Sequence, residues 1–125
     1  GLLVLLGIEH ADEESDVYWL VNKILNLRIF EDSNGVMNCS LLEVKGDLMV
    51  VSQFTLMAAT KKGNRPSYIR AATHEHAIPL YESFLAVARE RMEQAVVSGT
   101  FGAAMQIDLV NDGPVTIVID SKNKE

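Results

Sequence analysis

The chain alternates between apolar runs that suit strands and periodic stretches that suit helices. Residues 1–8 form a short continuous apolar run, which is typical of a buried strand. Between residues 12 and 27 the apolar positions recur three or four residues apart, which predicts a helix that Asp12 can cap. The same spacing returns at about residues 78–95, with Pro79 in the first turn. We therefore expect two amphipathic helices packed against a sheet.

The remaining apolar segments predict short strands. The pair Asn34-Gly35 between two of them favours a tight hairpin, because both residues tolerate positive φ. The pair Gly113-Pro114 inside the last turn is unusual, because proline has no N–H to give to a strand ladder. The expected strands cover residues 28–30, 36–39, 48–54, 105–109 and 115–119.

Composition indicates an ordinary globular protein. With 125 residues the chain is expected to form one domain with one core. Hydrophobic residues make up 48% and charged residues 22%, and the longest apolar run is too short to span a bilayer, so we expect no membrane partner. A single cysteine, Cys39, fits a reducing compartment, which favours the cytoplasm.

The charge balance argues against a broad nucleic-acid-binding surface but has one local exception. Eleven basic and 17 acidic residues give a net charge of −6, and we expect no DNA partner. From residue 48 to residue 74 there is no acidic residue, whereas four basic residues lie close together there: Lys61, Lys62, Arg65 and Arg70. Both a solvated loop and a small phosphate-facing patch fit this cluster.

Familiar catalytic constellations are missing. The histidines, His10, His74 and His76, lie in no nucleophile elbow or helical metal motif, and we interpret them as surface residues. We therefore expect no metal site and no cofactor. The polar residues of Ser52-Gln-Phe-Thr-Leu56 remain as candidates, because they follow a strand and could project into a cleft. Satisfying backbone groups is the alternative role for these hydroxyls.

The segments SQFTL at residues 52–56 and NDGPVT at 111–116 resemble the D-aminoacyl-tRNA deacylase family, the D-tyrosyl-tRNA deacylases. Three further segments resemble the family in the same order, so that the likeness covers essentially the whole chain: KILNLRIFED at 23–32, RPS at 65–67 and FGAAMQ at 101–106. Family members begin with an additional β-hairpin. We therefore expect residues 1–125 to form a single deacylase domain that lacks this hairpin.

The resemblance implies an α+β fold with a β-barrel-like, mainly antiparallel sheet and two outer helices. It implies a homodimer that hydrolyses the ester between a D-amino acid, or mischarged glycine, and the 3′ end of tRNA. It also implies that the Gly113-Pro114 peptide is cis and enters the active site of the partner subunit. There its main-chain atoms would act as a chiral gate that rejects L-residues.

The resemblance further implies roles for individual residues. An aminoacyl ester is activated and has a neighbouring hydroxyl, so the protein needs only to orient the attacking group and stabilise an oxyanion. The backbone N–H groups of Phe54 and Thr55 are candidate donors, and Ser52 and Gln53 would shape the pocket. Thr116 would lie beside the scissile bond, and water, a tRNA hydroxyl and Thr116 are all candidate attacking groups.

Recognition of the tRNA is assigned partly on the same basis. Phe101, Ala103 and Met105 would line an adenine pocket, with ordinary core packing as the alternative. The acid-free basic segment, and not the resemblance, suggests that Lys61, Lys62 and Arg65 contact the tRNA backbone. Two other functions remain open: an esterase for small D-amino acid esters, and a non-catalytic tRNA-binding or dimerisation module of the same fold.

Overall fold

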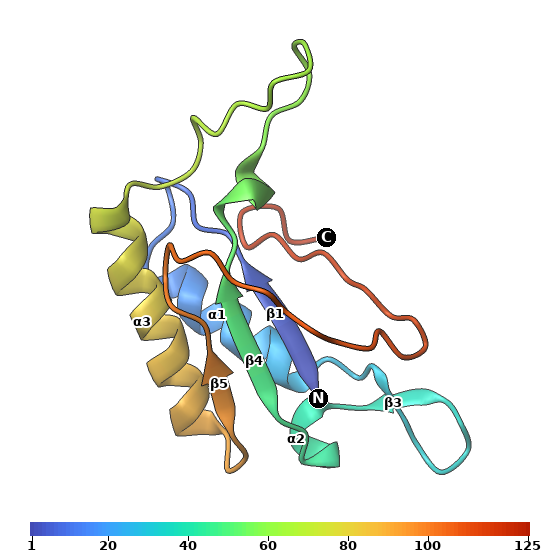
Figure 1. Ribbon diagram of the computed structural model, residues 1–125. Helices are drawn as coiled ribbons and strands as arrows, with labels where there is room; N and C mark the ends of the chain where they lie inside the picture. Colours follow the sequence, from blue (N-terminus) through green and yellow to red (C-terminus); the bar gives the residue numbers. More distant parts are fainter.

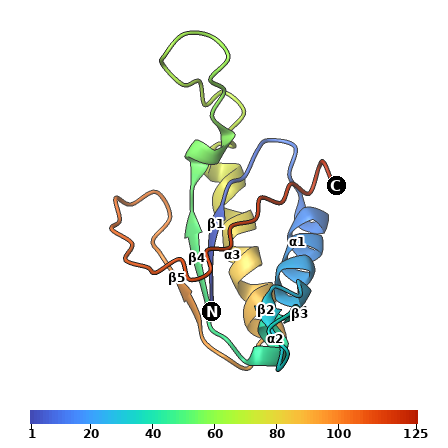
Figure 2. The same ribbon diagram turned by 90° about the vertical axis from the view of Figure 1, so that its right-hand side faces the viewer.

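The computed structural model describes all 125 residues, and its two main helices lie side by side on one face of a small sheet (Figures 1 and 2). The C-terminal segment crosses the other face (Figure 1). In chain order the elements are β1 (Leu2–Leu6), α1 (Glu14–Asn26), β2 (Phe30–Glu31), β3 (Met37–Cys39), α2 (Leu41–Val44), β4 (Leu48–Ser52), the 3-10 turn η1 (Phe54–Met57), α3 (His74–Arg91) and β5 (Val96–Ser98).

The main sheet is parallel, with β4 between β1 and β5. The register of β1 on β4 runs from Leu2 opposite Leu48 to Leu6 opposite Ser52. Parallel neighbours need crossover connections, and α1 and α3 lie within the two connections that lead into and out of β4. Because all three strands point the same way, the segments that follow them leave from one end of the sheet.

The core lies between this sheet and the helices. Leu48 and Val50 of β4 are 1% and 0% exposed, and they belong to one cluster of 17 buried residues. α3 contributes most of the helical side of that cluster, including Phe84 and Ala88. Burying a large aliphatic or aromatic side chain contributes about 1.5–3 kcal/mol, so β4 is the most firmly held strand.

Both predicted helices exist, with shifted boundaries. Asp12 does not cap α1; its carboxylate accepts from the N–H of Glu9 at 2.8 Å, and Glu13 is the N-cap residue. The N–H of Glu13 donates to Asp16 Oδ2 at 2.9 Å, which satisfies the backbone donor of the N-cap residue. α3 begins at His74 rather than near residue 78, so Pro79 lies inside the helix and not in its first turn.

The predicted mainly antiparallel, barrel-like sheet is wrong for this chain. The main sheet is parallel and open, and the only antiparallel ladder is the predicted hairpin, β2 with β3. The segments predicted as strands at 105–109 and 115–119 form no strand and pair with none, and β5 was not expected. Alternation of apolar residues marks a face of a strand, but it does not specify a partner for the backbone. The observed architecture is a mixed α/β fold with small sheets.

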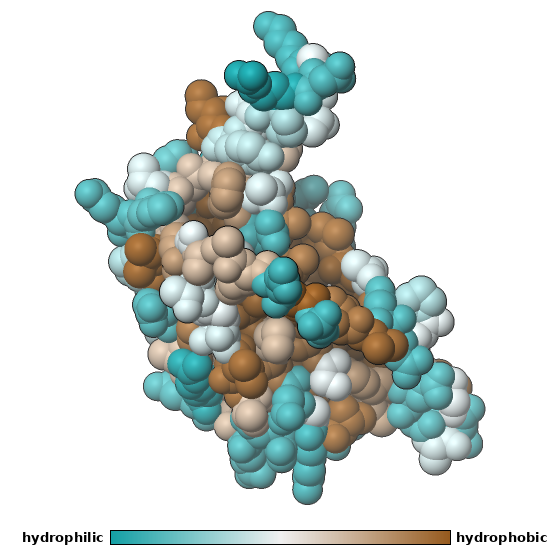
Figure 3. All heavy atoms as spheres, in the orientation of Figure 1, coloured by the Kyte–Doolittle hydropathy of each residue, from teal (hydrophilic) through white to brown (hydrophobic).

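The C-terminal segment is tied to the body at its end. Lys122 Nζ lies 2.8 Å from Asp16 Oδ2, and the ammonium of Lys124 lies 4.7 Å from the centre of the Trp19 ring. Between residues 103 and 118 every residue except the half-buried Ile107 is exposed; Val118, for example, is 92% exposed. Apolar side chains gather on the face that this segment crosses (Figure 3). None of the helices is long and apolar enough to cross a membrane.

A buried hydroxyl joins α3 to the end of the β4–β5 ladder. Tyr81 is 2% exposed, and its hydroxyl lies 3.2 Å from the carbonyl oxygen of Val50 and 3.1 Å from that of Gly99. The two carbonyls share the single hydroxyl proton. Burial raises the pKa of Tyr81, so the hydroxyl remains a donor at neutral pH.

We expect Tyr81→Phe to lower the free energy of unfolding by about 1–2 kcal/mol, because it removes a buried donor and leaves the Gly99 carbonyl without it. Urea denaturation measures this difference. The matched control is Tyr18→Phe, whose ring is half exposed on α1 and which we expect to change stability by less than about 0.5 kcal/mol. Equal stability of Tyr81→Phe and wild type would show that the hydroxyl does not fasten the end of the ladder.

Candidate active site

The SQFTL segment lies at the carboxyl end of the central strand, as predicted. Ser52 is the last residue of β4, and the N–H of Gln53 donates to the Leu6 carbonyl at 2.8 Å. The amide of Gln53 donates to Thr55 Oγ1, so these two side chains fix each other. Ser52, Gln53 and Thr55 are all half-buried. The buried core of β4 thus determines where this polar segment begins.

The turn that follows leaves main-chain donors available. η1 begins at Phe54, and the first N–H groups of such a turn have no acceptor within it. The first bond of the turn is donated by Leu56 to the Gln53 carbonyl at 3.2 Å. The N–H groups of Phe54 and Thr55 are therefore free to bind an oxygen atom that carries negative charge.

Phe101 lies beside the start of α3. Its ring contacts His74 edge-on at 5.5 Å between centroids and Tyr81 at 5.7 Å. His74 is an exposed residue, as predicted, and its ring supports Phe101. His76 is half-buried, and its Nε2–H donates to the Asp12 carbonyl at 2.7 Å. The contacts of His74 and Tyr81 with Phe101 were not predicted from the sequence. The apolar spacing of a helix does not show which aromatic residue of a later loop will pack against it.

Met105 and Ala103 have different surroundings. Met105 lines a shallow cavity of about 170 Å³ on the open face of the sheet, together with Val51, Val97 and Gly99. Ala103 is exposed, whereas Phe101 packs against the core from one side. Although both residues follow the end of β5, Phe101 contacts the buried core and Met105 lines the cavity on the open face of the sheet.

The NDGPVT turn is held by its own side chains. Asn111 Nδ2 donates to Thr116 Oγ1 at 3.0 Å, and Asn111 Oδ1 accepts from the N–H of Val115 at 3.3 Å. The Gly113-Pro114 peptide is cis, and Gly113 has a φ of +131°, which L side chains rarely adopt. A Cβ on Gly113 would also lie 3.2 Å from Val115 Cγ2. No hydrogen bond joins this exposed turn to residues 52–56 of the same chain.

The basic cluster lies on, and just after, the loop of residues 59–67, which projects from the body (Figure 1). The loop is closed at its base by two hydrogen bonds between the backbones of Ala59 and Ser67, at 2.8 and 2.9 Å. All four basic side chains are exposed, and none forms an ion pair; they are Lys61, Lys62, Arg65 and Arg70. The loop therefore offers unpaired positive charge beyond the carboxyl end of β4.

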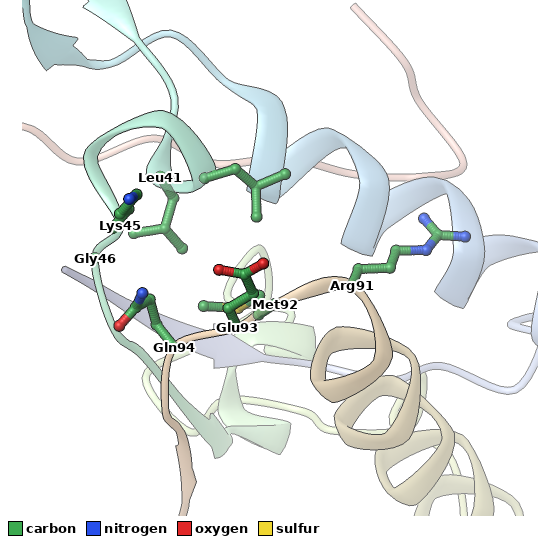
Figure 4. A pocket seen from close by; sticks show the side chains of 8 residues that line it. Leu41, Lys45, Gly46, Arg91, Met92, Glu93 and Gln94 are labelled. Carbon is green, nitrogen blue, oxygen red and sulfur yellow. The ribbon is translucent and has the colours of Figure 1, made fainter.

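A larger cavity than the one beside Met105 lies elsewhere. It has a volume of about 250 Å³ and lies between α2 and the end of α3, where Leu41, Lys45, Arg91 and Glu93 are among its lining residues (Figure 4). None of the predicted site residues lines it. No group of three or more His, Cys, Asp or Glu side chains in the chain could hold a metal ion.

Comparison with known proteins gives a consistent result. The family model described as D-Tyr-tRNA(Tyr) deacylase matches residues 1–120. A protein of Cytophaga hutchinsonii named D-aminoacyl-tRNA deacylase is 64% identical over 125 residues, which is all of this chain and 83% of that protein. A protein of Flavobacterium psychrophilum with the same name is 59% identical over the same shares of the two chains.

Two solved structures resemble the fold. One, described as a c-Myc DNA unwinding element binding protein, has a TM-score of 0.87 and 42% identity and covers 94% of this chain and 79% of its own. The other, described as a probable eukaryotic D-amino acid tRNA deacylase, has a TM-score of 0.68. At 20% identity, with 83% of this chain and 76% of its own covered, it supports the fold alone.

Proposed function

The chain belongs to the D-Tyr-tRNA(Tyr) deacylase family, and from that premise we propose how its residues carry out the reaction. The protein is a hydrolase that cleaves the ester bond of D-aminoacyl-tRNA and releases the D-amino acid and tRNA. The observation that carries this function is the similarity to D-aminoacyl-tRNA deacylases, which extends over all 125 residues. We place the reaction in the cytoplasm, with mischarged glycyl-tRNA as a second substrate.

The chemistry is proposed to depend on the main chain after β4. As water or a tRNA hydroxyl attacks the ester carbonyl, the N–H groups of Phe54 and Thr55 donate to the developing oxyanion. A donor of this kind contributes about 2.7–4 kcal/mol to transition-state stabilisation. Ser52 and Gln53 shape the pocket, and Gln53 holds Thr55 in place through their side-chain hydrogen bond. No cofactor takes part.

We propose that the site is completed by a second copy of the chain. The exposed apolar residues of the C-terminal segment support a homodimer, because a monomer rarely leaves such a segment in water. Gly113 and Pro114 would then reach the partner subunit's site as a main-chain gate for D-residues, with Thr116 beside the scissile bond. Phe101, Ala103 and Met105 would hold the terminal adenine. The exposure of the NDGPVT turn supports this arrangement.

The direct test compares hydrolysis of D-tyrosyl-tRNA and L-tyrosyl-tRNA. We expect rapid release of D-tyrosine and no release of L-tyrosine above the rate without enzyme. Gly113→Ala should lower the rate on the D-ester at least about tenfold, because alanine is strained at positive φ and crowds Val115. The matched control is Gly35→Ala, which also has positive φ, +74°, but lies in the β2–β3 hairpin with no atom within 4 Å of the added Cβ.

Other outcomes of this assay would exclude the proposal. Hydrolysis of neither ester would favour a non-catalytic tRNA-binding or dimerisation module. Equal hydrolysis of a small D-tyrosine ester and of D-tyrosyl-tRNA would favour a general esterase. Loss of activity in both glycine variants alike would indicate that Gly113 matters only for folding.

The basic loop generates a second prediction. Lys61→Ala combined with Lys62→Ala should weaken tRNA binding and reduce the slope of log K against log salt concentration by about one unit per lost phosphate contact. Titration of binding over a range of salt concentrations measures this slope. A matched control removes two lysines near Trp19, Lys23 and Lys124, and so changes the net charge equally. An identical slope in the two double variants would indicate that the loop is solvated and does not contact the phosphates of tRNA.

A further inference from the structure

An exposed pair of aromatic rings lies between the candidate catalytic turn and the basic loop. Phe54 is 57% exposed and Tyr68 is 37% exposed, and their rings meet edge to face with centroids 5.0 Å apart. Neither belongs to the buried core cluster. Phe54 is the first residue of η1, whereas Tyr68 comes directly after the loop that carries the lysines. Phe54 thus precedes the loop and Tyr68 follows it, and the two rings contact each other on the surface.

The backbone around Tyr68 is held on the body. Ser67 pairs with Ala59 through two hydrogen bonds, and the N–H of Ala71 donates to the Tyr68 carbonyl at 3.0 Å. The N–H of the next residue, Ala72, donates to the carbonyl of Ile8 at 2.9 Å. The segment that follows β1 therefore holds this end of the loop in place. The aromatic pair is thus placed in advance, and a flat ligand would lose little ordering entropy from the protein on binding it.

The charge around the pair identifies the class of ligand. The segment from residue 48 to residue 74 contains no acidic residue, and its exposed basic side chains form no ion pairs. Single-stranded nucleic acid is bound by this combination of unpaired positive charge and exposed aromatic faces. A phosphate backbone complements the loop, while a base has a flat face for the ring of Tyr68 or Phe54.

We propose that the Phe54–Tyr68 pair is a stacking subsite for a base of the unpaired tRNA nucleotides that precede the terminal adenosine. The proposal rests on the proposed function, which brings the terminal ester to the adjoining turn. The strand then leaves the catalytic turn over the aromatic pair, and its phosphates continue toward Lys61, Lys62 and Arg65. The two rings contribute affinity for tRNA, whereas only the main-chain N–H of Phe54 takes part in the chemistry.

The test compares two substrates that share the reacting ester. D-tyrosyl-tRNA contains the preceding nucleotides, and D-tyrosyl-adenosine lacks them. Tyr68→Ala should lower kcat/KM for the tRNA about 5- to 100-fold, the range expected for one stacked base, and leave the adenosine ester unchanged. Tyr68→Phe should retain the wild-type value on both substrates, because it keeps the ring. Tyr18→Ala is the matched control, since Tyr18 is 50% exposed on α1 and should affect neither substrate.

A binding measurement separates this proposal from the proposed function. Tyr68→Ala should weaken binding of uncharged tRNA about 5- to 100-fold and should not alter binding of tRNA shortened by its unpaired 3′ nucleotides. If the wild type hydrolysed no D-ester but showed this binding difference, the proposed function would fail and the subsite would remain.

Three results would overturn the subsite. The first is an equal loss of kcat/KM on both substrates, which would mean that Tyr68 shapes the catalytic turn. The second is unchanged binding of intact tRNA by Tyr68→Ala. The third is a change of molecular mass in sedimentation for Tyr68→Ala, which would assign the pair to an interface between copies of the chain.

Discussion

Burial of β4 is the constraint on which the other parts of the molecule depend. Leu48 and Val50 are almost completely excluded from water beneath α1 and α3, and the strand is paired on both edges. The parallel register then determines where β4 ends, and with it the position of Ser52. The available N–H groups of η1, the aromatic pair and the basic loop all follow from that end of the sheet. A shift of β4 would displace each of them.

The sequence predicted the elements better than their pairing. Helical spacing identified α1 and α3, and Asn34-Gly35 identified the β2–β3 hairpin, because these signals are local. The parallel direction of β1 and β4 is not local, since it depends on crossovers through α1 and α3. Residues 105–109 and 115–119 alternate like strands, yet no strand in the chain pairs with them. Val96–Ser98 was missed because three residues carry too little periodicity.

In the candidate site, too, local features could be predicted from the sequence and non-local contacts could not. The motif SQFTL was expected at the end of a strand and lies there, and the Gly113-Pro114 peptide is cis as the family resemblance implied. The contact of His74 and Tyr81 with Phe101 could not be predicted, because it depends on how α3 packs beside the loop after β5. The pairing of Phe54 with Tyr68 likewise requires a closed loop, and only the backbone bonds of Ala59 with Ser67 reveal that closure.

Main-chain donors, with the substrate's own hydroxyl or water, are proposed to carry out the chemistry without a side-chain general base. The pH dependence of the single-turnover rate constant on D-tyrosyl-tRNA tests this claim most directly. Without such a base, the rate constant should rise steadily between about pH 5.5 and 8.5, because attack depends on deprotonation of water or a hydroxyl. A bell-shaped profile, or a plateau reached near neutral pH, would show that an imidazole or carboxyl group takes the proton and would contradict the account.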